Sequence, residues 1–282
     1  MKQLNQKLLR TGLAVVIAVG AVVSQTAAAL EPAKVEAALK DAYNKYKGLQ
    51  EGANADYIPV LAKVDPNIFG ITLVTTDGKV YSVGDVKSEV SIQSISKVFT
   101  MAKVIEESGT TSISENMGVD ATGQVFNSIV AIEQYQGEEM NAMVNPGAIT
   151  ATSMIKGANG EEVWNTIINT YNDFAGRELR VDEEVYKSEA DTNQRNQALA
   201  MLMAAYGRIE GDALEATDIY TRQCSVAVNT RDLATMAATL ANGGTNPVTG
   251  KKVVSSENVD EVLAVMATAG LYDDSGQWLY RT

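Results

Sequence analysis

Ser91-Ile92-Gln93-Ser94-Ile95-Ser96-Lys97-Val98-Phe99 is the stretch of this sequence that decides the fold. From Ile95 onward the apolar residues recur at helical spacing, which predicts an amphipathic helix that ends at Gly109. Ser94 and Lys97 are three residues apart, so their side chains lie on one face of this helix and can touch. The stretch therefore predicts a helix that opens with a serine and a lysine side by side.

Two β-rich segments precede this helix. Residues 68–75 are followed by Asp77-Gly78 and then by the alternating residues 80–83, which together predict a β-hairpin with a D-G turn. Further upstream, apolar residues at helical spacing predict an amphipathic helix over 31–47. The order is thus a helix, a hairpin and the serine-bearing helix.

Most of the chain after Gly109 is expected to be helical. The periodicity predicts helices over 124–136, 147–157, 160–172, 192–207, 213–227, 230–241 and 255–268. A single antiparallel hairpin makes a poor sheet by itself, so the C-terminal part ought to supply more strands. Its sequence does not indicate any.

Composition excludes several classes of function. The chain contains no histidine, which rules out Ser-His-Asp and Cys-His catalytic systems and zinc sites that use histidine. Its single cysteine, Cys224, cannot form an intramolecular disulfide, and beside small apolar residues it is expected to be a buried side chain. The formal net charge of −12 disfavours a nucleic-acid partner. We expect no metal and no organic cofactor.

Ser94 and Lys97 offer a nucleophile and its base. A serine hydroxyl becomes a strong nucleophile only when a base takes its proton, and lysine can do so only as a neutral amine. Moving a lysine pKa from about 10.4 to near 7 requires roughly 4–5 kcal/mol of destabilisation of the charged form. The same S-x-x-K spacing occurs at Ser153 and Lys156, where ordinary helical polar residues are the simpler interpretation. Ser94 differs because it opens its helix directly after the hairpin.

Several motifs resemble one enzyme family in order and spacing, from about residue 35 to the end. They are residues 56–59, 64–66, the Asp77-Gly78 hairpin, 91–99, 145–149, 188–190, 195–196, 220–225 and 271–273. Together they are similar to the serine-dependent glutaminases of bacteria and mitochondria. The resemblance implies a β-lactamase/transpeptidase-like α/β fold, with an antiparallel sheet, helices and a mainly helical insert.

The resemblance also implies roles for individual residues. Ser94 would attack the side-chain amide of L-glutamine and form a γ-glutamyl ester, with Lys97 as the base. Tyr57 and Tyr220 would line the site as catalytic candidates, and one of them would share in the proton transfers. The residues expected to hold the substrate are Gln93, Ser94, Asn145, Glu189, Asn196, Tyr220 and Tyr272.

The residue chemistry agrees with these roles but leaves other interpretations open. The α-ammonium of glutamine needs a carboxylate such as Glu189, and its α-carboxylate needs neutral donors. Alternatively, Glu189 is one more solvated carboxylate, and Asn145 caps a helix that begins with Pro146. Tyr220, on an apolar helix, can equally be a core residue.

The first 29 residues have the pattern of a signal peptide. Basic residues are followed by the apolar residues 12–23 and then by the small residues 27–29. We therefore expect cleavage, a mature domain over 30–282, a periplasmic or secreted location and no stable membrane association afterwards. The alternative is an uncleaved membrane anchor.

The sequence departs from the family at its end. Family members continue past the Tyr272 segment into a glycine-rich strand that supplies an oxyanion donor, whereas this chain ends at Thr282. We expect the C-terminal strands to be missing, in either a fragment or a natural truncation. Two further functions stay open: an acyl-serine enzyme directed at β-lactams or D-Ala-D-Ala, and an inactive glutamine-binding remnant. The family also suggests a homo-oligomer, either a dimer or a tetramer.

Overall fold

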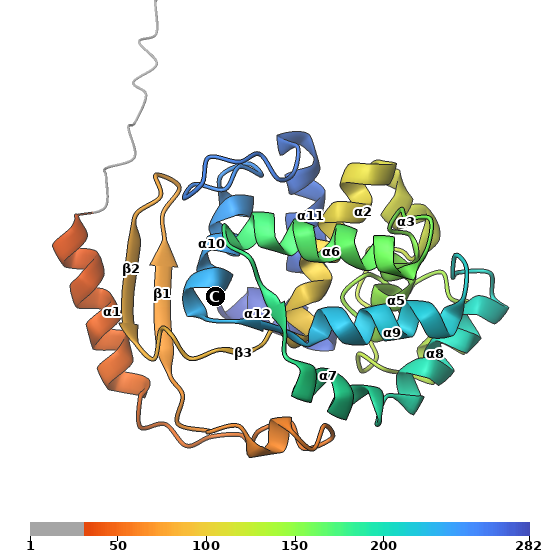
Figure 1. The fold of residues 1–282 in the computed structure, drawn as a ribbon, viewed down its shortest axis with the longest axis horizontal. Helices are drawn as coiled ribbons and strands as arrows, with labels where there is room; N and C mark the ends of the chain where they lie inside the picture. Colours follow the sequence, from red (N-terminus) through yellow and green to blue (C-terminus); the bar gives the residue numbers. More distant parts are fainter. Residues whose placement is uncertain (1–30) are drawn as a thin grey trace, which may run out of the picture.

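The computed structural model describes residues 31–282. The proposed signal peptide lies outside these residues. Figure 1 shows a helix and a β-hairpin at one side of the molecule and a mainly helical body at the other. The predicted class, α/β with antiparallel strands and many helices, is confirmed. The expectation that the C-terminal strands of the family are missing from this chain stays a prediction.

The predicted hairpin and the helix before it are both present. Strands β1 (Gly70–Val74) and β2 (Val80–Gly84) pair antiparallel, with Leu73 opposite Tyr81. Their turn needs Gly78, because its φ is +80° and a Cβ there would lie 2.5 Å from the carbonyl oxygen of Pro247. Helix α1 (Pro32–Tyr46) packs beside β2, and α10 (Thr230–Ala241) packs beside β1 (Figure 1).

The serine-bearing helix and most other predicted helices are also present. A short 3-10 turn, η2 (Gln93–Ile95), continues into α2 (Ser96–Ser108), which ends at Gly109 as predicted. The other predicted helices are α4 (Ile129–Tyr135), α5 (Asn145–Ser153), α6 (Gly160–Ala175), α8 (Gln194–Ala205), α9 (Ala213–Cys224) and α11 (Ser256–Ala269). Periodicity missed α3 (Thr111–Asn116), α7 (Glu183–Ala190) and α12 (Ser275–Arg281).

A second small sheet corrects the sequence prediction. The helix expected over 213–227 ends at Cys224, and the next residues form strand β5 (Val226–Val228). This strand pairs antiparallel with both β3 (Val90–Ser91) and β4 (Arg180–Val181). All three residues of β5 are buried, so the strand has no polar alternation by which a sequence pattern could reveal it. The hairpin is therefore not the only sheet.

This second sheet holds the segment that leads into Ser94. The backbone N–H of Ile92 donates to the carbonyl oxygen of Val226 at 2.8 Å, immediately after β3. β3 is an edge strand held by β5, and β5 is itself paired on its other side with β4.

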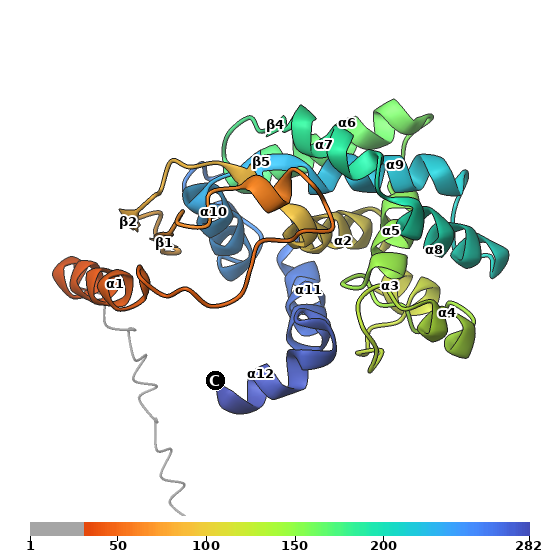
Figure 2. The same cartoon turned by 90° about the horizontal axis from the view of Figure 1, so that it is seen from below.

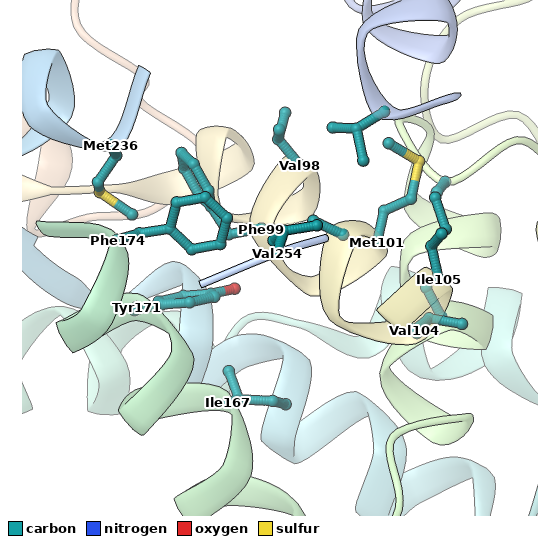
Figure 3. Close-up of a cluster of buried hydrophobic side chains, with 14 of the residues drawn as sticks. Val98, Phe99, Met101, Val104, Ile105, Ile167, Tyr171, Phe174, Met236 and Val254 are labelled. Atoms are coloured by element: carbon teal, nitrogen blue, oxygen red, sulfur yellow. The ribbon is translucent and has the colours of Figure 1, made fainter. Parts of the chain in front are cut away.

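Helix α2 runs through the main hydrophobic core. Figure 3 shows Phe99 of α2 against Tyr171 and Phe174 of α6, with ring centroids 6.0 and 4.8 Å apart. Met236 of α10 lies beside Phe174 and Val254 lies beside Phe99 in the same cluster (Figure 3). Aromatic pairs at these distances add stability beyond the apolar area that they bury. Within residues 31–282, no helix combines the length and the apolar character needed to cross a membrane.

Candidate active site

Ser94 lies at the start of a helix in an unusual backbone setting. The first hydrogen bond of its turn joins Ile95 N–H to the carbonyl oxygen of Ile92 at 3.3 Å, so the N–H of Ser94 has no partner within the helix. The preceding residue, Gln93, has a φ of +49°, in the left-handed region that disfavours side chains. Such a conformation costs on the order of 1–3 kcal/mol and tends to occur at functional sites.

Lys97 is a buried ammonium or amine without an acidic partner. Its side chain is 1% exposed, and Nζ donates to the carbonyl oxygen of Met143 at 2.9 Å and to Oδ1 of Asn145 at 2.7 Å. No carboxylate lies within ion-pair distance of Nζ in the described part of the chain. Burial lowers the pKa of Lys97 to about 8. Desolvation thus moves this lysine in the direction that a general base requires.

Asn145 connects three other polar side chains, and the alternative of a helix N-cap is wrong. The cap of α5 is Val144, and Asn145 is the first helical residue. Besides accepting from Lys97, its Oδ1 accepts from the hydroxyl of Tyr220 at 3.3 Å. Its Nδ2 donates to Oδ1 of Asn196 at 2.9 Å. The position of Asn145 therefore fixes Lys97, Tyr220 and Asn196 relative to one another.

Glu189 is buried, so the alternative of a solvated surface carboxylate is wrong. It is 6% exposed near the end of α7, a helix whose first turn is capped by Asp182. Its Oε2 accepts from Nε2 of Gln93 at 3.3 Å. Burial raises the pKa of Glu189 to about 7, and the Gln93 bond and the charge of Lys97 only partly oppose this shift. Glu189 is thus a desolvated carboxylate directed towards the residue that precedes Ser94.

A cavity of about 220 Å³ gathers most of the residues predicted for the site. Its lining includes Tyr57, Gln93, Ser94, Asn145, Glu189, Asn196 and Tyr220. Lys97 lies behind this wall and reaches it through Asn145. Tyr57 is 66% exposed, which places its ring at the mouth of the cavity. Tyr220, by contrast, is buried and belongs to both the cavity wall and the core, so the core interpretation is also correct.

Tyr272 approaches the same group from the C-terminal part of the chain. Its ring packs against that of Phe126 with centroids 5.2 Å apart, and Lys97 Nζ lies 5.3 Å from its centre. Burial raises the pKa of Tyr272, and the proximity of the Ser94 hydroxyl opposes that shift. The structure therefore brings all nine predicted site residues together.

Some cavity residues were not predicted from the sequence. They are Ile58, Phe126, Asn127, Thr192, Asn193, Arg195 and Cys224. Cys224 could have been found, because it follows Tyr220 by four residues on one helix face. It is buried as expected, and burial raises the pKa of its thiol to about 12. Phe126 precedes α4 in irregular backbone and carries no sequence signal for its position.

The second S-x-x-K pair lies elsewhere. Ser153 ends α5, where its hydroxyl donates to the carbonyl oxygen of Thr150 at 2.7 Å. The ammonium of Lys156, beyond the helix, donates to the carbonyl oxygen of Glu107. Neither residue lines the cavity that contains Ser94. The two pairs have the same spacing, so it is the position directly after the hairpin that distinguishes Ser94 from Ser153.

Comparison with known proteins places this geometry in a family. The family model described as Glutaminase matches residues 52–282. The chain belongs to the glutaminase family. It is 51% identical over 247 residues to a glutaminase of Colwellia psychrerythraea. The aligned region covers 88% of this chain and 79% of that relative.

Solved glutaminase structures have the same fold. A structure described as a probable glutaminase matches with a TM-score of 0.88 and 43% identity, over 89% of this chain and 82% of the other. A structure described as Mglu in its glutamate form matches with a TM-score of 0.82 and 35% identity, over 87% of this chain and 57% of the other. The predicted family and the predicted β-lactamase-like fold are both confirmed.

Proposed function

We propose that this chain hydrolyses the side-chain amide of L-glutamine to L-glutamate and ammonia through a covalent ester on Ser94. The observation that carries the mechanism is Lys97, which is buried without an acidic partner behind the cavity wall that holds Ser94. Membership of the glutaminase family supports the substrate.

Lys97 acts as the base in its neutral form. A neutral amine has two N–H donors and one lone pair. The two donors are satisfied by Met143 O and Asn145 Oδ1, which leaves the lone pair for the proton of the Ser94 hydroxyl. In this structure Lys97 Nζ bonds to these two oxygens and not to Ser94. The hydrogen bond from the Ser94 hydroxyl to Nζ therefore forms only when substrate is bound.

The reaction then proceeds in two stages. Ser94 Oγ attacks the amide carbon, and the proton that Lys97 has taken passes to the leaving nitrogen, which departs as ammonia. Water, deprotonated by the same amine, attacks the ester carbon and releases glutamate while Ser94 recovers its proton. The N–H of Ser94, which has no partner within its helical turn, stabilises the oxyanion in both stages.

The cavity residues recognise the amino-acid end of the substrate. The carboxylate of Glu189 pairs with the α-ammonium, which also supplies the charge partner that this buried group lacks. The neutral donors on the cavity wall, from Asn196 and Tyr57, face the α-carboxylate. Gln93 holds Glu189 in place through its 3.3 Å hydrogen bond.

Measurement of ammonia and glutamate released from L-glutamine tests this function. Ser94→Ala and Lys97→Met are expected to lower kcat by at least about 1,000-fold, as removal of a nucleophile or its base does in other enzymes. The matched controls Ser153→Ala and Lys156→Met keep wild-type rates. Turnover that survives Ser94→Ala would contradict the mechanism.

The same assay separates the competing functions. Hydrolysis of nitrocefin without hydrolysis of glutamine would favour the β-lactam-directed enzyme. A folded protein that binds glutamine without any turnover would favour the inactive remnant. The family relationship favours glutamine, since the curated relatives are glutaminases.

We also propose that the protein is exported and assembles as a homo-oligomer. Export is supported by the basic, apolar and small-residue order of residues 1–29. Assembly is supported by the family resemblance. Mass spectrometry of the mature N-terminus and light scattering of the purified protein test the two statements. An intact Met1 or a monomer at all concentrations would contradict them.

A further inference from the structure

The segment that leads into α5 is irregular backbone that is nevertheless buried. Residues 140–144 lie outside any helix or strand, and their exposed fractions are all 3% or less. They enter α5, which packs beside α2 and α9 (Figures 1 and 2). Irregular segments normally run over the surface, because buried backbone N–H and C=O groups need hydrogen-bond partners. The partners of this segment therefore indicate why it is buried.

One of its carbonyl groups contacts the proposed base. The carbonyl oxygen of Met143 accepts from Lys97 Nζ at 2.9 Å. In a trans peptide unit the C=O and the N–H that follows it point in opposite directions. The N–H of Val144 donates to the carbonyl oxygen of Asn141 at 3.3 Å, so the Met143 carbonyl points the other way, towards Lys97. The backbone of Asn141 thus fixes the orientation of this peptide plane.

The side chain of Asn141 fixes the neighbouring peptide plane. It is buried, and its Oδ1 accepts from the N–H of Met143 at 2.9 Å, a bond to the backbone two residues on that is typical of asparagine in turns. Its Nδ2 donates to the carbonyl oxygen of Asp120 at 2.7 Å, which anchors the turn to the loop before α4. Gly147 lets the turn approach α5, because a Cβ there would overlap the carbonyl oxygens of Met140 and Asn141. The Met143 carbonyl is therefore held from both sides of its residue.

We propose that Asn141 is a positioning residue, which aims the Met143 carbonyl at Lys97 and so holds the base behind Ser94. The inference rests on the proposed role of Lys97 and adds to it a residue that does not line the cavity. An acceptor aimed at Nζ stabilises the ammonium more than the amine. It also keeps the amine from moving away from Ser94 once it has lost its proton.

The other groups around Lys97 do not obscure this effect. The titratable groups that act on it are Glu189 of α7, Tyr220 and Cys224 of α9, and Tyr272. Within residues 31–282 Asn141 hydrogen-bonds to none of them, and Asn141→Ala changes no charge. Loss of a directed acceptor for the ammonium is therefore expected to lower the pKa of Lys97, by roughly one unit.

The pH profile of glutamine hydrolysis by Asn141→Ala tests the proposal. We expect the higher apparent pKa of kcat/KM to fall by about one unit. At pH 10 kcat is expected to fall at least about tenfold because the amine is no longer aimed, while KM stays within about threefold of the wild type. Asn141→Ser can make the same turn bond more weakly and shifts both values by less, so it decides the question even if Asn141→Ala does not fold.

Asn246→Ala is the matched control. Asn246 is also fully buried, its Oδ1 accepts from the N–H groups of Val248 and Thr249, and its Nδ2 donates to the carbonyl oxygens of Asp173 and Phe174. It clamps a turn as Asn141 does, but it does not line the cavity that contains Ser94. Its replacement is expected to lower the melting temperature and to keep the wild-type kcat and pH profile. A loss of activity in Asn141→Ala with an unshifted pH profile would overturn the proposal, by showing a structural role alone.

A second measurement follows Lys97 without turnover. The difference in unfolding free energy between a protein and its Lys97→Met variant changes with pH once Lys97 loses its proton in the folded state. Urea unfolding measures this difference in the wild type and in the Asn141→Ala background, where we expect its onset about one pH unit lower. The same onset in both backgrounds, or a higher one in Asn141→Ala, would overturn the proposal. Absence of glutamine hydrolysis by the wild type would contradict the proposed function, whereas this onset still decides the role of Asn141.

Discussion

Lys97 and Glu189 illustrate how burial sets the chemistry of single residues here. Both charged forms lose hydration, so the pKa of the lysine falls to about 8 while that of the glutamate rises to about 7. Neither group has an ion-pair partner in the described residues. A substrate that carries an α-ammonium supplies the ion-pair partner that Glu189 lacks.

The pH dependence of the reaction follows from these two residues. As the pH rises through about 7, Glu189 becomes charged and binds the α-ammonium; as it rises through about 8, Lys97 becomes the free base. We expect kcat/KM for glutamine to rise across this window, with two apparent pKa values that belong to the pair. A steady-state pH profile measures this. A rate that falls between these two values would contradict the assigned roles.

Lys97 also affects stability. Its folded-state pKa lies below the ordinary 10.5, so the unfolded state binds more protons, and the stability due to this group rises from pH 8 towards 10.5. At pH 7 the buried charge of Lys97 destabilises the folded state by roughly 3 kcal/mol, and Lys97→Met removes this cost. The variant also loses two hydrogen bonds of about 1 kcal/mol each, which offsets part of the gain. We expect this variant to be inactive yet more stable by about 1 kcal/mol in urea unfolding. A clear loss of stability would show that Lys97 is not a strained group.

At the scale of single residues, the sequence predicted those that carry a motif. Ser94, Lys97, Asn145 and Glu189 were all named from local patterns that matched the family. Phe126 was not, because an aromatic residue in irregular backbone gives no sign of what it faces.

At the scale of elements, predictability depended on whether a segment has one solvated face. Helix α10 was predicted with its observed bounds because it is amphipathic and opens with a capping box between Asn229 and Asp232. Strand β5 was missed because all of its residues are buried, and it follows α9 after a single residue, Ser225. The small strands β3 and β4 contain two residues each, too few for any period to be visible.

The junction between α2 and α11 carries a prediction for stability. Glu106, in the last turn of α2, accepts from Ser255 N and Oγ at 3.0 and 2.8 Å and from Asn258 Nδ2 at 2.6 Å. Burial acts to raise the pKa of Glu106, but these bonds outweigh it and the pKa is lowered. The stabilisation is therefore present above the ordinary carboxyl pKa and is lost as the pH falls through the lowered value.

Glu106→Gln is expected to reduce the free energy of unfolding by about 1 kcal/mol at neutral pH, through loss of charge-assisted bonds. The difference from the wild type should vanish in acid. The control Glu115→Gln, on an exposed residue of α3, leaves the unfolding curve unchanged. Equal curves for the wild type and Glu106→Gln at neutral pH would contradict the role of this junction.

At the scale of the whole molecule, the site depends on segments that are far apart in sequence. Tyr57 lies before the hairpin, Ser94 after it, Asn145 and Glu189 in the helical body, and Tyr272 near the end. No periodicity reports such long-range proximity. Only the resemblance to a family predicted that these residues meet, and the structure brings them together around one cavity.

Such a site couples ligand binding to global stability. L-Glutamate, which retains the α-ammonium and α-carboxylate, is expected to raise the free energy of unfolding by about 2.7 kcal/mol at 100 times its Kd. Glu189→Gln should remove this effect, and Glu184→Gln, an exposed residue on the same helix, should keep it. Thermal melting with increasing glutamate measures the difference. Equal stabilisation of both variants would contradict the assignment of Glu189 to the ammonium.

The most direct test of the ester on Ser94 is acid quenching during turnover of L-glutamine, followed by peptide mass spectrometry. We expect a glutamyl group on the peptide that contains Ser94. Neither the adduct nor release of ammonia is expected in Ser94→Ala. A glutamyl group on another residue such as Cys224, or continued turnover by Ser94→Ala, would contradict the serine mechanism.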